Sequence, residues 1–197
     1  CVYMFGNCDN FNSDINFDLT SGTNFSYGLF SGCTSFNGDM SGMDTSTLTT
    51  MRDMFTDCTS LNNNSMMGWD VSNVTDMINM FKGCTSFNQD FTTWDTGSVT
   101  TMMRMFSSAT AFNGNVDVFD TSSVNDMEFM FANAIAFDKD FSNWDIVATG
   151  LSMQGFMFGK TFNDYSAANY DILLSRCEQG GLSNITLDMG TIKYTIG

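Results

Sequence analysis

Residues 69–91 read WDVSNVTDMINMFKGCTSFNQDF, and this unit recurs along the chain. Its anchor is Phe81, and an equivalent aromatic residue follows or precedes it at intervals of 25 or 26 residues. The seven anchors are Phe5, Phe30, Phe55, Phe81, Phe106, Phe131 and Phe156. A unit this short cannot bury its apolar face alone, because it needs a neighbour to stack on. The period therefore predicts a stack of about seven coils.

Equivalent positions in successive coils form columns of one residue type. A large apolar residue follows each anchor by six positions, methionines precede the anchors, and an indole or another large apolar residue comes just before an aspartate. Such recurrence indicates inward positions that fill a common core. The predicted core includes Phe30, Phe55, Phe81, Phe106, Phe131, Trp69, Trp94 and Trp144.

Each coil is expected to contain a short strand and one or two helical turns. Apolar residues at 74, 77, 80 and 81 have helical spacing, and Gly83 fits a helix exit. Residues 86–91 have the pattern of a strand. We therefore predict a solenoid of short parallel β-strands alternating with short α or 3-10 turns.

The predicted solenoid spans residues 1–163 with an incomplete first coil, and residues 164–197 differ from the repeat. Residues 166–177 have the pattern of an amphipathic helix, and residues 184–189 and 191–196 alternate around Gly190 like a hairpin. We expect the helix and hairpin to cap the C-terminal end. The N-terminal end would then stay uncapped, which suggests upstream sequence or a covering chain.

Composition excludes several classes of function. The 197 residues include 22 acidic and 7 basic side chains and no histidine, so the net charge is −15. Nucleic-acid binding needs clustered Lys and Arg, and imidazole-based catalysis or zinc binding needs histidine. No apolar run is long enough to span a membrane, so we predict neither nucleic-acid binding nor membrane insertion.

The unit at 69–90 resembles the bacterial surface-protein repeat of about 25 residues. That repeat is known from mycoplasma lipoprotein-type domains of unknown function and is related to BspA-like leucine-rich repeats. The resemblance covers residues 1 to about 163, and residues 165–174 resemble the segment that closes such arrays. It implies a leucine-rich-repeat-like solenoid fold and an extracellular or cell-surface protein linked to adhesion.

Four cysteines share one column, three residues after the anchors: Cys8, Cys33, Cys58 and Cys84. Stacked coils bring such residues within disulfide range, but parallel side chains orient poorly for the bond. Pairs such as Cys8–Cys33 and Cys58–Cys84 and a column of reduced thiols are both open. Metal binding needs ligands that converge from several sides, which one column does not provide.

Acidic and amide columns have structural interpretations and one alternative. Asparagines after the second aromatic residue and aspartates after the tryptophan are expected to satisfy backbone groups in turns. A further column of carboxylates is a solvated stripe or a calcium site, with Asp14, Asp39, Asp90 and Asp140 as candidate ligands. No other cofactor is expected. Sequons place candidate glycosylation sites at Asn24, Asn63, Asn73 and Asn184.

No residue constellation indicates an enzyme, because the acidic residues stand at repeated positions. We therefore expect a non-enzymatic extracellular or surface repeat protein that mediates adhesion or other protein–protein interaction. One alternative is a structural subunit of a filament or surface layer that self-associates through the uncapped N-terminal end. A second alternative is a calcium-dependent or carbohydrate-binding module.

Overall fold

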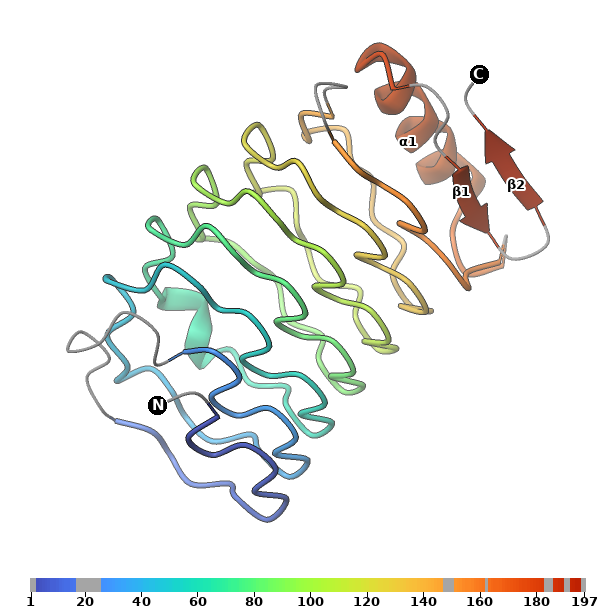
Figure 1. The fold of residues 1–197 in the computed structure, drawn as a ribbon. Coiled ribbons are helices and arrows are strands. Elements are labelled where there is room, and N and C mark those ends of the chain that lie inside the picture. The colour runs from blue at the N-terminus through green and yellow to red at the C-terminus, as the bar shows by residue number, and fades with distance from the viewer. Residues whose placement is uncertain are drawn as a thin grey trace.

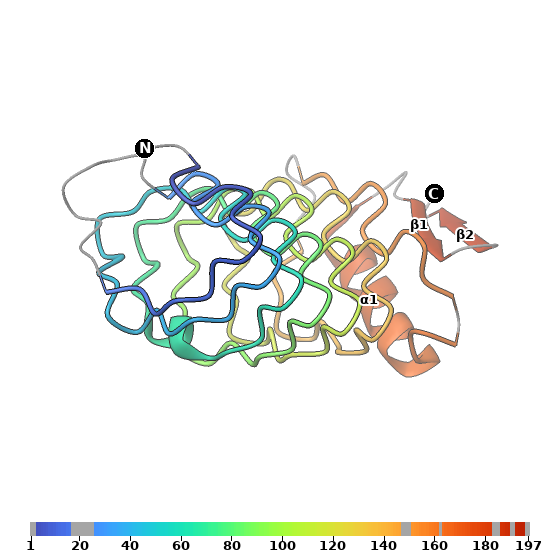
Figure 2. The same ribbon diagram turned by 90° about the horizontal axis from the view of Figure 1, so that it is seen from below.

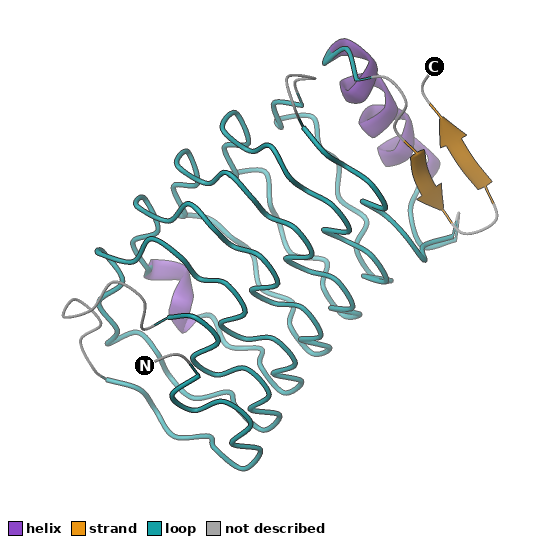
Figure 3. Ribbon diagram, in the orientation of Figure 1, coloured by secondary structure: helices purple, strands orange, loops and turns teal. Residues whose placement is uncertain are grey.

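The computed structural model describes residues 3–16, 26–146, 151–161, 163–182, 186–189 and 192–195. In these residues the coils stack side by side along one axis, from the N-terminal coil to helix α1 (Figure 1). Viewed from below, successive coils overlie one another and α1 lies across the end (Figure 2). The regular elements are η1 (Ser65–Gly68), α1 (Ala167–Gln179), β1 (Thr186–Met189) and β2 (Ile192–Thr195). Turns and loops form the rest of the described chain (Figure 3).

Two consecutive turns surround each anchor. In the coil of Phe81, the amide of Met80 donates to the Met77 carbonyl (3.2 Å), and the amide of Cys84 donates to the Phe81 carbonyl (3.1 Å). The third residues of these turns, Asn79 and Gly83, have φ of 56° and 71°. A left-handed third residue is the pattern of a type II turn, which favours Gly and Asn. The second turn of each coil accordingly has Asn7, Gly32, Asp57, Gly83, Ser108, Asn133 and Gly159 at this position, all with positive φ.

The predicted leucine-rich-repeat-like solenoid of parallel strands and helical turns is wrong. Residues 74–81 form no helix and residues 86–91 form no strand. Where both partners are described, the strand-like pairing between coils consists of isolated parallel bridges from Thr50 through Asp76, Thr101 and Asp126 to Ser152. Because a turn closes every few residues, no run is long enough to form a strand. Gly83 belongs to a turn, not to a helix exit.

The coils are joined by backbone hydrogen bonds and stacked rings. Each anchor phenylalanine from Phe5 to Phe131 donates its amide hydrogen to a carbonyl of the next coil, at 2.9–3.0 Å. Anchor rings of neighbouring coils stack with centroids 5.5–5.6 Å apart from Phe5 to Phe131. The core aromatics Phe30, Phe55, Phe81, Phe106, Phe131, Trp69, Trp94 and Trp144 are at most 5% exposed.

The last coil is shifted by one residue from the register that the seven sequence anchors predict. Phe106 donates its amide hydrogen to the carbonyl of Met130, the residue before the next anchor, whereas Phe131 donates to the carbonyl of Phe156. The bridge from Asp126 to Ser152 likewise spans 26 residues. Met157, not Phe156, therefore occupies the seventh anchor position, so an extra residue precedes Ser152.

Helix α1 covers the last coil. Its N-cap Ser166 accepts a hydrogen bond from the Asn169 amide, and Tyr170, Leu173 and Cys177 are buried. Arg176 donates to the carbonyl of Trp144. Strands β1 and β2 form an antiparallel hairpin with Thr186 opposite Thr195. The described part contains no helix long and apolar enough to span a membrane.

Candidate functional site

An amide ladder crosses the whole stack. The Oδ1 atoms of Asn12, Asn37, Asn62, Asn88 and Asn113 each accept a hydrogen bond from the backbone amide of the equivalent residue in the next coil, at 2.7–2.9 Å. The ladder ends at Asp138, whose Oδ1 accepts from the Ser166 amide and the Asn169 side chain. These bonds outweigh the effect of burial and lower the pKa of Asp138. The ladder thus links the coils to one another and to α1 by hydrogen bonds, and the side-chain oxygens in it serve a structural role.

Carboxylates in the other columns also bind the backbone. Asp70 and Asp120, which follow Trp69 and Phe119, accept from the amides of Ser72 and Ser122. Hydrogen bonds from these serines lower the pKa of both carboxyls. This agrees with the turn role expected from the sequence.

The four candidate calcium ligands are spread along one column. Asp14 accepts from the Asp39 amide (2.9 Å) and Asp90 from the Asn115 amide (2.7 Å). Asp39 and Asp140 accept from the serine amides two residues ahead. The described residues contain no group of three or more acidic or sulfur ligands that could hold a metal ion. Each carboxylate thus acts as a backbone acceptor.

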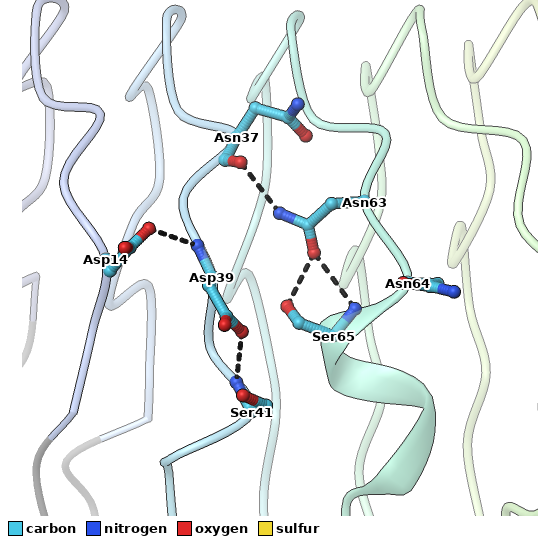
Figure 4. A pocket seen from close by; sticks show the side chains of 7 residues that line it. All are labelled: Asp14, Asn37, Asp39, Ser41, Asn63, Asn64 and Ser65. Atoms are coloured by element: carbon cyan, nitrogen blue, oxygen red, sulfur yellow. Dashed lines mark hydrogen bonds between the residues drawn. The ribbon is translucent and has the colours of Figure 1, made fainter.

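A polar hollow of about 470 Å³ interrupts this column where the third coil carries an extra residue (Figure 4). Asn63 donates to the carbonyls of Asn37 and Gly38 and accepts from Ser65. Asp14 and Asp39 line the same hollow, with Ser41 and Asn64. The lining offers amide, hydroxyl and carboxylate groups and no cation, so it suits hydroxyl or ammonium donors better than anions.

The two sequons in the described part differ in availability. The side chain of Asn63 is engaged in the hollow, as above. Asn73 is exposed, and its side chain donates to the Ser46 carbonyl (2.8 Å). Asn24 and Asn184 lie outside the described residues.

The cysteine column consists of free thiols. Cys8 is exposed, whereas Cys33, Cys58 and Cys84 are buried. The Sγ atoms of the three buried residues lie 2.9–3.0 Å from the anchor carbonyls of the preceding coil, at Phe5, Phe30 and Phe55. Burial raises the pKa of all three thiols. The structure therefore has the reduced column rather than the disulfide pairs that the sequence also allowed.

The same column ends in a buried lysine. The predicted register, with Phe156 as the seventh anchor, does not place this lysine in the column. Because Met157 is the seventh anchor, Lys160 occupies the position that Ala134 has in the sixth coil. Lys160 is 0% exposed, and its Nζ donates to the carbonyls of Ala134 (2.7 Å) and Ile135 (3.0 Å). Burial lowers its pKa to about 8, although Asp164 and Asp138 oppose this shift. The shifted register was the signal that could have revealed it.

The outward residues of the two turns form a surface that we call the turn face. It comprises the second and third residues of each turn, from Tyr3 in the first coil to Phe158 in the seventh. Tyr3 and Phe158 are 45% and 44% exposed. The Tyr3 ring lies over Gly28, where an added Cβ would come within 2.3 Å of it, and Phe129 covers Gly155 in the same way.

Side chains of the turn face contact one another along the stack. Tyr3 and Tyr27 meet edge to face with centroids 5.5 Å apart, and so do Phe129 and Phe158 at 6.2 Å. Arg104 lies over the Phe129 ring at 5.3 Å. Near the middle, Asn79 donates to Asp53 (2.9 Å), while its buried Oδ1 has no hydrogen-bond partner. The repeat pattern of the sequence does not single out these residues, because they do not recur from coil to coil.

These features define a stacked repeat protein in which columns of polar side chains stabilise the coils through hydrogen bonds to the backbone. A family model described as "Mycoplasma protein of unknown function, DUF285" matches residues 1–67 and 62–170. The chain belongs to that family. No curated protein and no solved structure matches it.

Proposed function

We propose that this chain is a non-enzymatic repeat protein of the cell surface or extracellular space, and that it mediates adhesion by binding protein through its turn face. The supporting observation is the contrast between inward and outward positions of the turns. Inward positions repeat Met, Phe and Cys, whereas outward positions change from Tyr27 to Arg52 to Met103 along the stack. Repeat proteins bind through variable side chains on a regular frame.

The composition of the turn face favours protein as the ligand. Tyr, Phe, Arg and Met are enriched in protein–protein interfaces, and Tyr and Arg are also enriched among the few residues that dominate the binding energy. The columns, by contrast, use their Asn and Asp oxygens to bind backbone amides, which argues against catalysis or calcium binding there. The BspA-like relation inferred from residues 69–90 supports the same surface role.

The proposal is tested with beads that carry the full chain, applied under flow to surfaces coated with purified extracellular matrix proteins, glycans or the chain itself. We expect retention on at least one of the protein-coated surfaces. Retention should fall about tenfold in the double variant Tyr3→Ser, Phe158→Ser, because exposed aromatic rings contribute strongly to binding energy at protein interfaces. Val118→Ser is the matched control, since Val118 is 41% exposed but lies outside the turn face.

Two outcomes would contradict the proposal. One is retention no greater than that of beads coated with an unrelated acidic protein. The other is an equal loss in the double variant and in Val118→Ser, which would make the turn face irrelevant.

A further inference from the structure

We propose that the turn face binds a second copy of this chain, with the coils of the two copies in opposite order. This inference rests on the proposed function and names its partner. A two-fold axis across the middle of the turn face would set the first coil against the seventh, the second against the sixth and the third against the fifth. Such a contact is isologous, so each pair of facing residues occurs twice.

Charge is the first argument for a second copy. The chain has a net charge of −15, so two copies repel one another over most of their surfaces. On the turn face, three basic and three acidic residues cancel, since 3 − 3 = 0. They are Arg52, Lys82, Arg104, Asp53, Asp57 and Glu128. Two acidic molecules can therefore approach through this face without net repulsion.

The order of residues along the face is the second argument. Aromatic side chains occupy both ends, with Tyr3 and Tyr27 in the first two coils and Phe129 and Phe158 in the last two. Opposite coil order brings Tyr3 of one copy to the end that carries Phe158 of the other. Both rings are nearly half exposed and would lose apolar surface to water on pairing.

A pair of opposite charges fixes the orientation. Asp53 in the third coil and Arg104 in the fifth have the same place in the first turn, with φ of 57° and 55°. Opposite coil order therefore makes Asp53 of each copy face Arg104 of the other. Arg104 forms no ion pair within the described residues, whereas Arg52 already binds Asp76 at 2.8 Å. A carboxylate of the second copy would give the Arg104 guanidinium an ion-pair partner.

The fourth coil would lie at the axis. Asn79 has the same place in its turn as Asp53 and Arg104, so the Asn79 residues of the two copies would face each other. Lys82 also lies near the axis, where its flexible four-carbon stem lets the two ammonium groups separate.

The size of the face predicts a weak contact. Six steps of 5.5–5.6 Å along the anchor rings give a length of roughly 33 Å. With a width of about 10 Å, each copy would bury roughly 350 Å², below the ~800 Å² of a standard interface. Pairing in solution should therefore be weak, with adhesion arising from many copies on each surface.

A charge exchange tests the pairing. We would compare the wild type, Arg104→Glu, Asp53→Arg and an equimolar mixture of the two variants by sedimentation equilibrium, up to about 1 mM protein. Arg104 shows that this turn position accepts a long basic side chain. Each variant alone should associate at least tenfold more weakly than the wild type, because like charges then face each other. The mixture should recover to within about threefold, because every facing pair is again opposite. Thermal melts confirm that each variant folds.

Three outcomes would overturn the inference: a monomeric wild type at all concentrations, Arg104→Glu that associates like the wild type, or a mixture no stronger than its components. Beads retained on matrix proteins would still support the proposed function in each of these cases. Loss of retention on every surface would contradict the proposed function itself.

Discussion

The ammonium group of Lys160 lies 2.7 Å from the carbonyl oxygen of Ala134, in the column that buried cysteines occupy in earlier coils. In those coils a thiol reaches back to a carbonyl of the preceding coil. The lysine also donates to the preceding coil, but to the carbonyls of Ala134 and Ile135 rather than to that coil's anchor, and with a charge in place of a weak donor. The last coil therefore differs chemically from those before it while keeping the same inward geometry.

The buried lysine predicts a specific dependence of stability on pH. The folded state lowers the pKa of Lys160 to about 8 from its ordinary 10.5, mainly through burial. Between these values the unfolded state binds more protons, so stability rises with pH. We expect the free energy of unfolding of the wild type, minus that of Lys160→Met, to increase from pH 8 to pH 10.5. Chemical denaturation at several pH values measures this difference.

The paired comparison removes the contribution of the thiols. Burial raises the pKa of Cys33, Cys58 and Cys84, and that of Cys177 to about 12. Their contribution to stability is present below the ordinary thiol pKa and is lost as pH rises, equally in both proteins. A difference that stays flat across this range would show that folding does not lower the pKa of Lys160.

Replacement of a turn glycine should destabilise the stack. Gly83 has φ of 71°, and a Cβ there would lie 2.1 Å from Oδ1 of Asp57. Gly83→Ala should cost about 2 kcal/mol or more through backbone strain and this overlap. Gly68→Ala is the control, because no atom lies within 4 Å of its added Cβ. Denaturant unfolding measures both, and equal stabilities would contradict the assigned turns.

The amide ladder should contribute measurably to stability. Asn88 accepts from the Asn113 amide at 2.8 Å and donates its own amide hydrogen to Asn62. Asn88→Ala removes the first of these bonds and should cost about 1 kcal/mol. Asn125→Ala is the control, since that exposed side chain makes no hydrogen bond with any other described residue. If both variants unfold alike, the ladder has no role in holding the coils.

Thiol labelling tests the reduced column. In a Cys1→Ser background at pH 8, we expect one fast-reacting thiol, Cys8, because Cys33, Cys58, Cys84 and Cys177 are buried. Labelling after denaturation should add four more. Intact mass spectrometry counts the labels. A denatured protein that carries a total of only one or three labels, in place of five, would contain disulfides.

The inward residues could be read from the sequence, but the backbone could not. Met77, Met80, Phe81 and Cys84 are spaced like one face of a helix, and all four are buried. Two type II turns in succession give the same spacing, because each turn also returns the chain inward after three residues. Periodicity alone cannot separate the two cases.

The deciding signal was at the outward positions. Asn7, Gly32, Asp57, Gly83 and Asn133 are residues that tolerate positive φ, and they recur once per coil. A helix needs negative φ throughout, so it would not favour such residues at this spacing. The turn face was missed for the opposite reason: its members, such as Arg104 and Phe158, do not recur, so a search for repeats passes over them.

Pairing of two turn faces with their coils in opposite order can be tested by cross-linking. In that arrangement Tyr27 of one copy faces Glu128 of the other, because both precede the left-handed residue of the first turn, in the second and sixth coils. We would place Tyr27→Cys and Glu128→Cys in separate chains that carry Cys1→Ser and Cys8→Ser, and oxidise them alone and mixed. We expect a disulfide-linked dimer in the mixture and little in either chain alone. Equal cross-linking in all three samples, or none in the mixture, would contradict this pairing.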